Sequence, residues 1–212
     1  MGTTVADVMT TKVIAVTRDA DFKQLASVLR EFRVSACPVV DGAGRVIGVV
    51  SEADLLYKVA DCELPVGLIR LRWKLAEESK ITAVTAGQLM TAPAVTIHAD
   101  APVQVAARVM QDRQLKRLPV VGPLGELVGI VSRVDLLALY DRPDADILAE
   151  VASVVDEFGV SAGVDVTVSS GVVTLAGSVR SPRAALELAA RLRHVEGVVA
   201  VRDRLTVGQP IG

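Results

Sequence analysis

The chain contains little of several residue types on which common binding sites are built. Only 3% of its 212 residues are aromatic, which argues against a stacking platform for single-stranded nucleic acid. The formal net charge is −2, so there is no overall basic excess for nucleic-acid binding. The two cysteines, Cys37 and Cys62, have no metal-binding or redox spacing. We therefore expect them to be small apolar residues in a reducing compartment.

Signals for export, membrane insertion and catalysis are also missing from the sequence. No stretch approaches the ~18 consecutive apolar residues of a membrane-spanning helix, and the first residues lack the features of a signal peptide. His98 and His194 belong to no nucleophile or metal constellation, and no phosphate-binding loop of the GxxxxGK[ST] kind occurs. We therefore expect a cytoplasmic, non-catalytic protein. Because 51% of its residues are hydrophobic, we also expect the chain to fold into a globular structure.

The chain contains an internal repeat, in which residues 5–56 recur without a gap as residues 86–137. The copies agree at 16 of 52 positions, whereas roughly four identities are expected by chance in a chain this rich in alanine and valine. At about 50 residues, one copy can hardly bury enough surface to be stable alone. We therefore expect the copies to pack sheet against sheet as one pseudo-symmetric domain. The identical pairs include Met9/Met90, Pro38/Pro119, Gly48/Gly129, Ser51/Ser132, Asp54/Asp135 and Leu55-Leu56/Leu136-Leu137.

Each copy has the pattern of a β-α-β-β-α unit. In the first copy, residues 13–16 predict a strand, and Asp19 or Asp21 is the expected N-cap of a helix with one apolar face. Residues 38–40 predict a second strand, and a glycine-containing turn at 41–44 leads into a third. The unbroken apolar run of this third strand, residues 46–50, predicts burial on both sides, and Ser51 begins a second helix.

Residues 57–85 connect the two copies. Leu64, Leu68, Leu71 and Leu75 form one stripe there, beside Arg70, Arg72 and Lys74. The stripe predicts either a surface helix over the pair or a partner-binding helix, with Trp73 as a possible anchor.

From Asp144 the repeat does not return and a different unit begins. The pattern predicts the order α-β-β-α-β. The first helix follows from the helical spacing between Ile147 and Phe158, and a hairpin turns at Ser169–Gly171. A second helix begins at Ser181-Pro182 and stops at Gly197, and the last strand starts at Val198. The predicted fold class is α+β: tandem β-α-β-β-α repeats plus a small separate α-β-β-α-β domain. The predicted boundaries are 1–60, 61–85 for the connection, 86–141 and 144–207, with a junction at 141–143.

The two copies resemble CBS domains, the cystathionine-β-synthase type that occurs in tandem pairs. The shared signs are Met-Thr ahead of the first strand, the Pro-Val-Val strand and Gly-x-x-Ser-x-x-Asp at the end of the third strand. The resemblance implies that AMP, ADP, ATP or S-adenosylmethionine binds between the copies and regulates a partner or an attached domain. It assigns the ribose hydroxyls to Ser51 with Asp54, and to Ser132 with Asp135.

A carboxylate can accept hydrogen bonds from both vicinal hydroxyls of a ribose, and a serine three residues earlier lies on the same side of a helix start. The alternative is that Ser-x-x-Asp is a capping box, with serine as N-cap and aspartate at N3, whether or not a ligand binds. Both interpretations remain open at this point, and they can coexist.

The copies differ in charge around this motif. Lys116-Arg117 in the second copy replaces Ser35-Ala36 in the first, and Arg133 replaces Glu52. Charge-assisted hydrogen bonds to phosphate are roughly twice as strong as neutral ones, so Lys116, Arg117 and Arg133 are the candidate phosphate-binding residues. The alternative for each is an ordinary solvated surface charge, and the sequence does not say which cleft these residues reach.

The C-terminal unit is similar to BON domains, through residues 165–179 and the later Val195-Glu196-Gly197-Val198. BON domains are associated with phospholipid attachment in exported proteins. Residues 144–212 contain nine acids and six arginines, a net charge of −3, which weakens attraction to an anionic membrane despite a possible patch of Arg191, Arg193, Arg202 and Arg204. We expect a protein-interaction role here.

The sequence is consistent with two functions. The first is a sensor in which the CBS pair binds an adenosyl ligand and passes its state to the BON domain or an unknown protein partner. The alternative is a structural adaptor whose clefts are empty and whose CBS pair only dimerises. In both cases the CBS resemblance and the apolar helix ends at Leu55-Leu56 and Leu136-Leu137 predict a homodimer.

Overall fold

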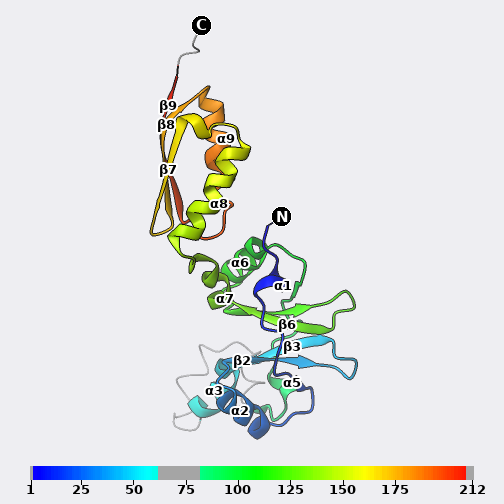
Figure 1. Cartoon of the computed structure of the whole chain (residues 1–212). Coiled ribbons are helices and arrows are strands. Elements are labelled where there is room, and N and C mark those ends of the chain that lie inside the picture. The colour runs from blue at the N-terminus through cyan, green and yellow to red at the C-terminus, as the bar shows by residue number, and fades with distance from the viewer. Residues whose placement is uncertain (1, 62–81, 209–212) are drawn as a thin grey trace. The chain divides into compact units, whose positions relative to one another are not determined.

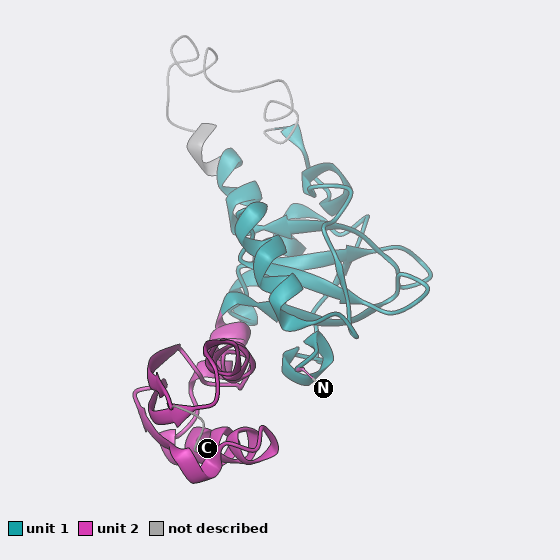
Figure 2. Cartoon of the chain, turned by 90° about the horizontal axis from the view of Figure 1, so that it is seen from above, with its two compact units in different colours: residues 1, 3–133 teal, residues 2, 134–212 magenta. Residues whose placement is uncertain are grey.

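The computed structural model describes residues 2–61 and 82–208. They fall into two compact units, residues 3–133 and 134–212, shown in different colours in Figure 2. The predicted leucine stripe of the connection, with Trp73 and Cys62, lies outside the described residues.

The first unit holds both copies, each as a three-stranded sheet with helices (Figure 1). In both sheets the first strand is parallel and the third antiparallel to the middle strand, which confirms the predicted α+β repeats. The first copy contains β1 (Val16–Thr17), α2 (Phe22–Glu31), β2 (Ala36–Val40), β3 (Val46–Ser51) and α3 (Glu52–Asp61). The second contains β4 (Ile97–His98), α6 (Val103–Asp112), β5 (Arg117–Val121), β6 (Leu127–Ser132) and α7 (Arg133–Leu137), the last of which runs into the second unit.

Asp21, rather than Asp19, is the N-cap of α2. Its Oδ1 accepts a hydrogen bond from the Gln24 backbone at 2.9 Å, and Gln24 Oε1 accepts one from the Asp21 backbone at 3.0 Å. This reciprocal pair satisfies two backbone donors that the first helical turn leaves without partners. The helix then buries Leu25 and Leu29 against the sheet.

Two predictions about the strands of the first copy are wrong. Strand β1 comprises only Val16 and Thr17, because it pairs with β2 over just two residues. Strand β3 is not buried on both sides: Gly48 and Val50 are buried, whereas the rest of the strand is half-buried. The buried residues alternate along β3, so one face of the strand is covered more completely than the other, and an apolar run is not by itself evidence for burial on both sides.

Each copy begins with a short helix that the sequence pattern did not predict, and each of these helices packs on the opposite copy. Helix α1 (Val5–Val8) donates backbone hydrogen bonds from Val5 and Ala6 to residues 101 and 99 of the second copy, both at 2.8 Å. Helix α5 (Ala86–Leu89) donates backbone hydrogen bonds to residues 20 and 18 of the first copy, also at 2.8 Å. Ala86 and Leu89 are fully buried in the first copy's core. The N-terminal segments of the two copies are therefore exchanged.

The exchange explains the Met9/Met90 and Gly48/Gly129 identities between the copies. Thr91 pairs with Val49 on β3 through two backbone hydrogen bonds, and Thr10 pairs in the same way with Ile130 on β6. The methionine before each threonine covers a glycine: a Cβ at Gly48 would overlap Sδ of Met90 and lie 2.8 Å from its Cγ. Gly129 has the same relation to Met9.

The second unit confirms the predicted order α-β-β-α-β. Its sheet has the order β7-β8-β9, with β7 and β8 as a hairpin and β9 parallel to β8. Figure 1 shows both helices on one face of this sheet. The elements are α8 (Asp144–Glu157), β7 (Val164–Ser169), β8 (Val172–Val179), α9 (Pro182–Leu192) and β9 (Ala200–Val207).

Gly197 is not the stop of α9, as the sequence suggested, because the helix ends at Leu192, five residues earlier. Gly197 has φ +85°, and a Cβ there would lie 2.7 Å from the Ile147 side chain. The glycine is needed for close packing of the α9–β9 loop against α8.

The junction before α8 is bonded to the second unit. Arg142 Nη1 donates to Glu150 Oε2 at 2.8 Å and to the Glu196 carbonyl at 2.9 Å. The Asp144 carboxylate accepts hydrogen bonds from the backbone of Ser170 and Gly171 in the hairpin turn, at 2.7 and 2.8 Å. Residues 142–144 are therefore part of this unit's fold rather than a free linker.

Candidate functional site

The first Ser-x-x-Asp motif forms a capping interaction at the junction of β3 and α3. The backbone N–H and the hydroxyl of Ser51 both donate to Asp54 Oδ2, at 2.8 and 2.7 Å. Asp54 is 7% exposed and is the one buried charged residue in the described part of the chain. The bond from the Ser51 backbone to the Asp54 carboxylate is one of the two bonds of a capping box, and Asp54 Oδ2 already accepts two hydrogen bonds.

The second motif occupies equivalent elements. Ser132 is the last residue of β6, and Asp135 lies in the first turn of α7, as Ser51 and Asp54 do in β3 and α3. Asp135 is half-buried, so it is more accessible than Asp54. The assignment of either pair to ribose hydroxyls stays a prediction.

Arg117 joins the two copies. It begins β5, and its Nη2 donates to the hydroxyl of Ser35, which precedes β2, at 2.7 Å. Its Nε is the one buried side-chain nitrogen or oxygen without a hydrogen-bond partner among the described residues. A buried donor without an acceptor is rare and costs about 1–3 kcal/mol, so such a group needs an explanation, such as an absent ion or ligand.

Ser35 is a further residue of this site, and the sequence pattern did not predict it. Its hydroxyl accepts from Arg117, and its carbonyl oxygen accepts from the backbone N–H of Glu52, the first residue of α3, at 3.0 Å. Ser35 thus contacts both the arginine of the second copy and the helix start beside Asp54. Only the mismatch between Ser35-Ala36 and Lys116-Arg117 marked this position in the sequence.

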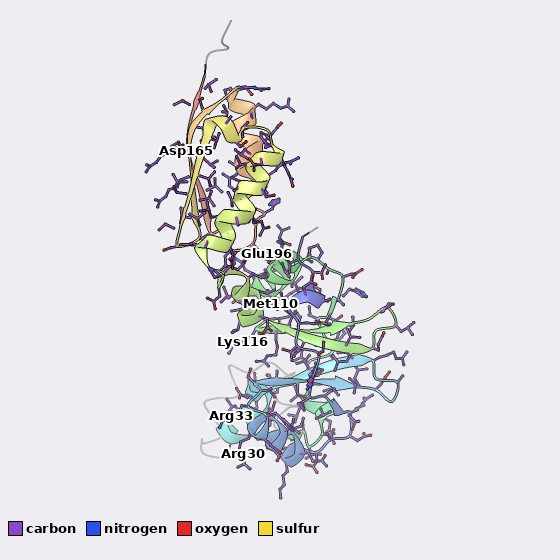
Figure 3. The ribbon with its side chains drawn as sticks, in the orientation of Figure 1. Arg30, Arg33, Met110, Lys116, Asp165 and Glu196 are labelled. Carbon is purple, nitrogen blue, oxygen red and sulfur yellow. The ribbon has the colours of Figure 1, made fainter. Side chains whose placement is uncertain are left out.

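Arg133 forms hydrogen bonds within the second copy. Its Nε donates to the Leu115 carbonyl at 2.8 Å, and its Nη2 donates to the Met110 carbonyl at 3.4 Å. The Met110 carbonyl lies in the last turn of α6 and the Leu115 carbonyl in the loop that follows it, near the helix end where a cation is favoured by the helix dipole. Arg133 therefore caps α6. This role explains why the second copy has arginine where the first copy has Glu52, and the explanation does not need a bound phosphate. Lys116 is exposed beside Arg117, and Figure 3 shows Lys116 and Arg33 on the same side of the unit.

Other reactive residues do not add to the site. Cys37 is fully buried, as expected, and burial raises the pKa of its thiol to about 11, which keeps it protonated near neutral pH. Among the described residues, no group of three or more His, Cys, Asp or Glu could hold a metal ion. Nor does any helix in residues 2–61 or 82–208 have the length and apolarity needed to cross a membrane.

Comparison with known protein families identifies both parts of the chain. The family model of the CBS domain matches residues 5–61 and 86–142, which is more than half of the chain. The chain belongs to the CBS-domain family. The family model of the BON domain matches residues 143–209, so the CBS pair is followed by a BON domain. Both resemblances drawn from the sequence are thereby confirmed.

Individual relatives agree with this assignment. An uncharacterized protein of Methanocaldococcus jannaschii is 32% identical over 142 residues, which make up 59% of this chain and 84% of that protein. The chain spans 50% or less of the next three curated relatives, and one of these is a homoserine O-acetyltransferase of Methanococcoides burtonii, of which it spans 23%. Such partial matches do not show that this CBS protein is itself an enzyme.

Two solved structures have the same fold as the CBS pair. The structure of CBSX2 from Arabidopsis thaliana in complex with AMP is 28% identical, covers 65% of this chain and 95% of its own, and has a TM-score of 0.57. The CBS domain pair of protein MJ0100 in complex with 5′-methylthioadenosine and S-adenosyl-L-methionine is 23% identical, with coverage of 66% of this chain and 98% of its own and a TM-score of 0.54.

Proposed function

We propose that this CBS pair is a regulatory, non-catalytic module that binds a phosphate-bearing adenosyl ligand, such as AMP, ADP or ATP. The observation that carries the proposal is Arg117, whose buried Nε has no partner while its Nη2 is held at the contact between the copies. Nε and the adjacent Nη of a guanidinium form a fork that fits two oxygens of a phosphate. The AMP complex of CBSX2, which has the same fold, supports an adenosyl ligand.

Arg117 also narrows the ligand class. S-adenosylmethionine has a sulfonium cation where a nucleotide has a phosphate, and a cation near an unpaired guanidinium is unfavourable. We therefore favour nucleotides over S-adenosylmethionine at the site that Arg117 faces. Lys116 would add a second positive charge at its rim, whereas Arg133 stays on α6.

Calorimetric titration of the full chain with AMP, ADP, ATP and S-adenosylmethionine tests this function. We expect heat of binding with at least one nucleotide and weaker binding of S-adenosylmethionine. If no ligand binds at millimolar concentration, the structural adaptor becomes the better description. In either case we propose a cytoplasmic protein in which the BON domain contacts a protein partner.

The two aspartates give a test of site preference. Asp135→Ala should weaken nucleotide binding about tenfold, through the loss of hydrogen bonds to the ribose, and Asp54→Ala should weaken it less. Asp54 is buried and its Oδ2 is already used in capping, whereas Asp135 is half-buried. Calorimetry of both variants decides this, with circular dichroism to compare any loss of helix. Equal losses, or a larger loss in Asp54→Ala, would show that the second motif is not the better site.

The CBS pair is also proposed to form a homodimer. Leu56 on α3 is 58% exposed and Leu137 on α7 is 64% exposed, although both end apolar runs. Exposed leucines on matching elements of a repeat suit a self-complementary contact around a two-fold axis. Light scattering should give the mass of a dimer at micromolar concentration, and Leu56→Glu with Leu137→Glu should give a monomer. A monomeric wild-type chain over that range would contradict the proposal.

A further inference from the structure

Within the second unit, α8 and α9 both pack on one face of the sheet, and none of the unit's described residues covers the other face (Figure 1). Val173, Leu175, Val201 and Leu205 point into the core, so the residues between them form the open face. Strand pairing sets the residues of this face in rows across the three strands: Thr167–Thr174–Arg202 and Asp165–Ala176–Arg204. Figure 3 shows Asp165 on the side of the sheet away from the helices.

The open face is positively charged at β9. Arg202 and Arg204 lie two residues apart on one strand and are both exposed. Neither has an ion-pair partner within the described part of the chain, and the neighbouring strand presents only the small side chains of Thr174 and Ala176. The result is a flat surface with two unpaired guanidinium groups along one edge.

Helix α8 has the opposite charge. Its 14 residues contain five acids and no lysine or arginine. Asp144 is used in the hairpin turn, but Asp146, Asp156 and Glu157 are exposed. The last two lie at the C-terminal end, where a negative charge interacts unfavourably with the helix dipole. Their position is not explained by the stability of the helix.

The exposed side of α8 is also flat. Ala145, Ala149 and Ala152 are exposed, and Leu148 between them is 38% exposed. At 1.5 Å per residue the helix is about 21 Å long, and an eight-residue strand of about 26 Å is long enough to receive it. Small side chains on both surfaces allow a helix to lie closely on a sheet.

The geometry points to a head-to-tail contact in which the open sheet face of one chain binds α8 of a second copy of the chain. The two complementary surfaces lie on opposite faces of the same unit, so the contact is heterologous and can repeat from chain to chain. It is electrostatic in large part and weakens as salt rises, because exposed charges are screened over about 8–10 Å at 0.1–0.15 M ionic strength. It adds to any dimer formed by the CBS pair.

Sedimentation velocity of the full chain in low salt and in 0.5 M sodium chloride tests the contact. The wild-type protein should form species larger than its high-salt form at low salt, and Arg202→Glu with Arg204→Glu should weaken this association at least tenfold. Arg183→Glu with Arg193→Glu makes the same change in net charge on and just after α9, and should leave association nearly unchanged. A mass that does not depend on salt, or equal effects of the two pairs, would overturn the inference.

A mixing experiment separates this contact from a two-fold contact and from binding to an unrelated acidic protein. The Asp146→Arg and Glu157→Arg variant loses the acidic helix surface, and the Arg202→Glu and Arg204→Glu variant loses the basic sheet surface. At low salt, each variant alone should show no species larger than its high-salt form. An equal mixture should form larger species, because the helix of one chain then fits the sheet of the other. Failure of the mixture to associate would also overturn the inference.

Discussion

Replacing Arg117 with methionine should weaken AMP binding about 30- to 100-fold and leave the binding of adenosine nearly unchanged. The reason is that two charge-assisted hydrogen bonds to a phosphate are lost, worth about 2–3 kcal/mol, whereas adenosine has no phosphate. Titration calorimetry with the two ligands measures the difference. Arg113→Met, which removes an exposed arginine after α6, is the matched control and should change neither affinity.

The same variant also tests whether Arg117 is merely structural. Its Nε is a buried donor without an acceptor, and its Nη2 has one neutral partner, Ser35. Methionine removes the unsatisfied donor, so the ligand-free variant should unfold at the wild-type temperature or slightly above it. A lower unfolding temperature together with equal losses for AMP and adenosine would mean that Arg117 holds the copies together rather than binding phosphate.

The sequence was sufficient to predict most of the fold, because its signals are local. Helical spacing, the Asp21 N-cap and the glycine turn each depend on neighbouring residues. The second copy of the repeat also showed the same pattern for each element, which made the prediction firmer. The exchange of α1 and α5 could not be predicted in this way. A four-residue helix shows no periodicity, and its partners lie about 70 to 100 residues away in the chain. The identical Met9/Met90 and Gly48/Gly129 pairs were the only trace of it.

The candidate site was predicted less completely, for a related reason. Ser51 and Asp54 are three residues apart, so their contact follows from sequence spacing, and capping was foreseen. The contact between Ser35 and Arg117 joins residues 82 positions apart, and only the fold brings them together. Arg133 was grouped with Lys116 and Arg117 because of its charge, but its guanidinium is bound to carbonyls in the last turn of α6 and the loop that follows it. Charge alone did not distinguish a helix cap from a ligand contact.

The exchanged segments lead to a strong expected effect on stability at Gly48. Gly48→Ala should lower the free energy of unfolding by about 1–3 kcal/mol, because the new Cβ overlaps the side chain of Met90 in a packed interface. Gly42→Ala is the matched control, since Gly42 has a negative φ and nothing lies within 4 Å of a Cβ there. Urea denaturation followed by circular dichroism measures both variants.

Met90→Ala identifies the cause of that effect. If the overlap with Met90 destabilises Gly48→Ala, shortening the methionine makes room for the new methyl group. The double variant should then be more stable than the sum of the two single losses predicts, by at least about 1 kcal/mol. Because Met90 lies in the N-terminal segment of the second copy and Gly48 lies in the first copy, such a coupling energy is direct evidence in solution that the segments are exchanged. Additive losses would place Met90 away from Gly48 and contradict the exchange.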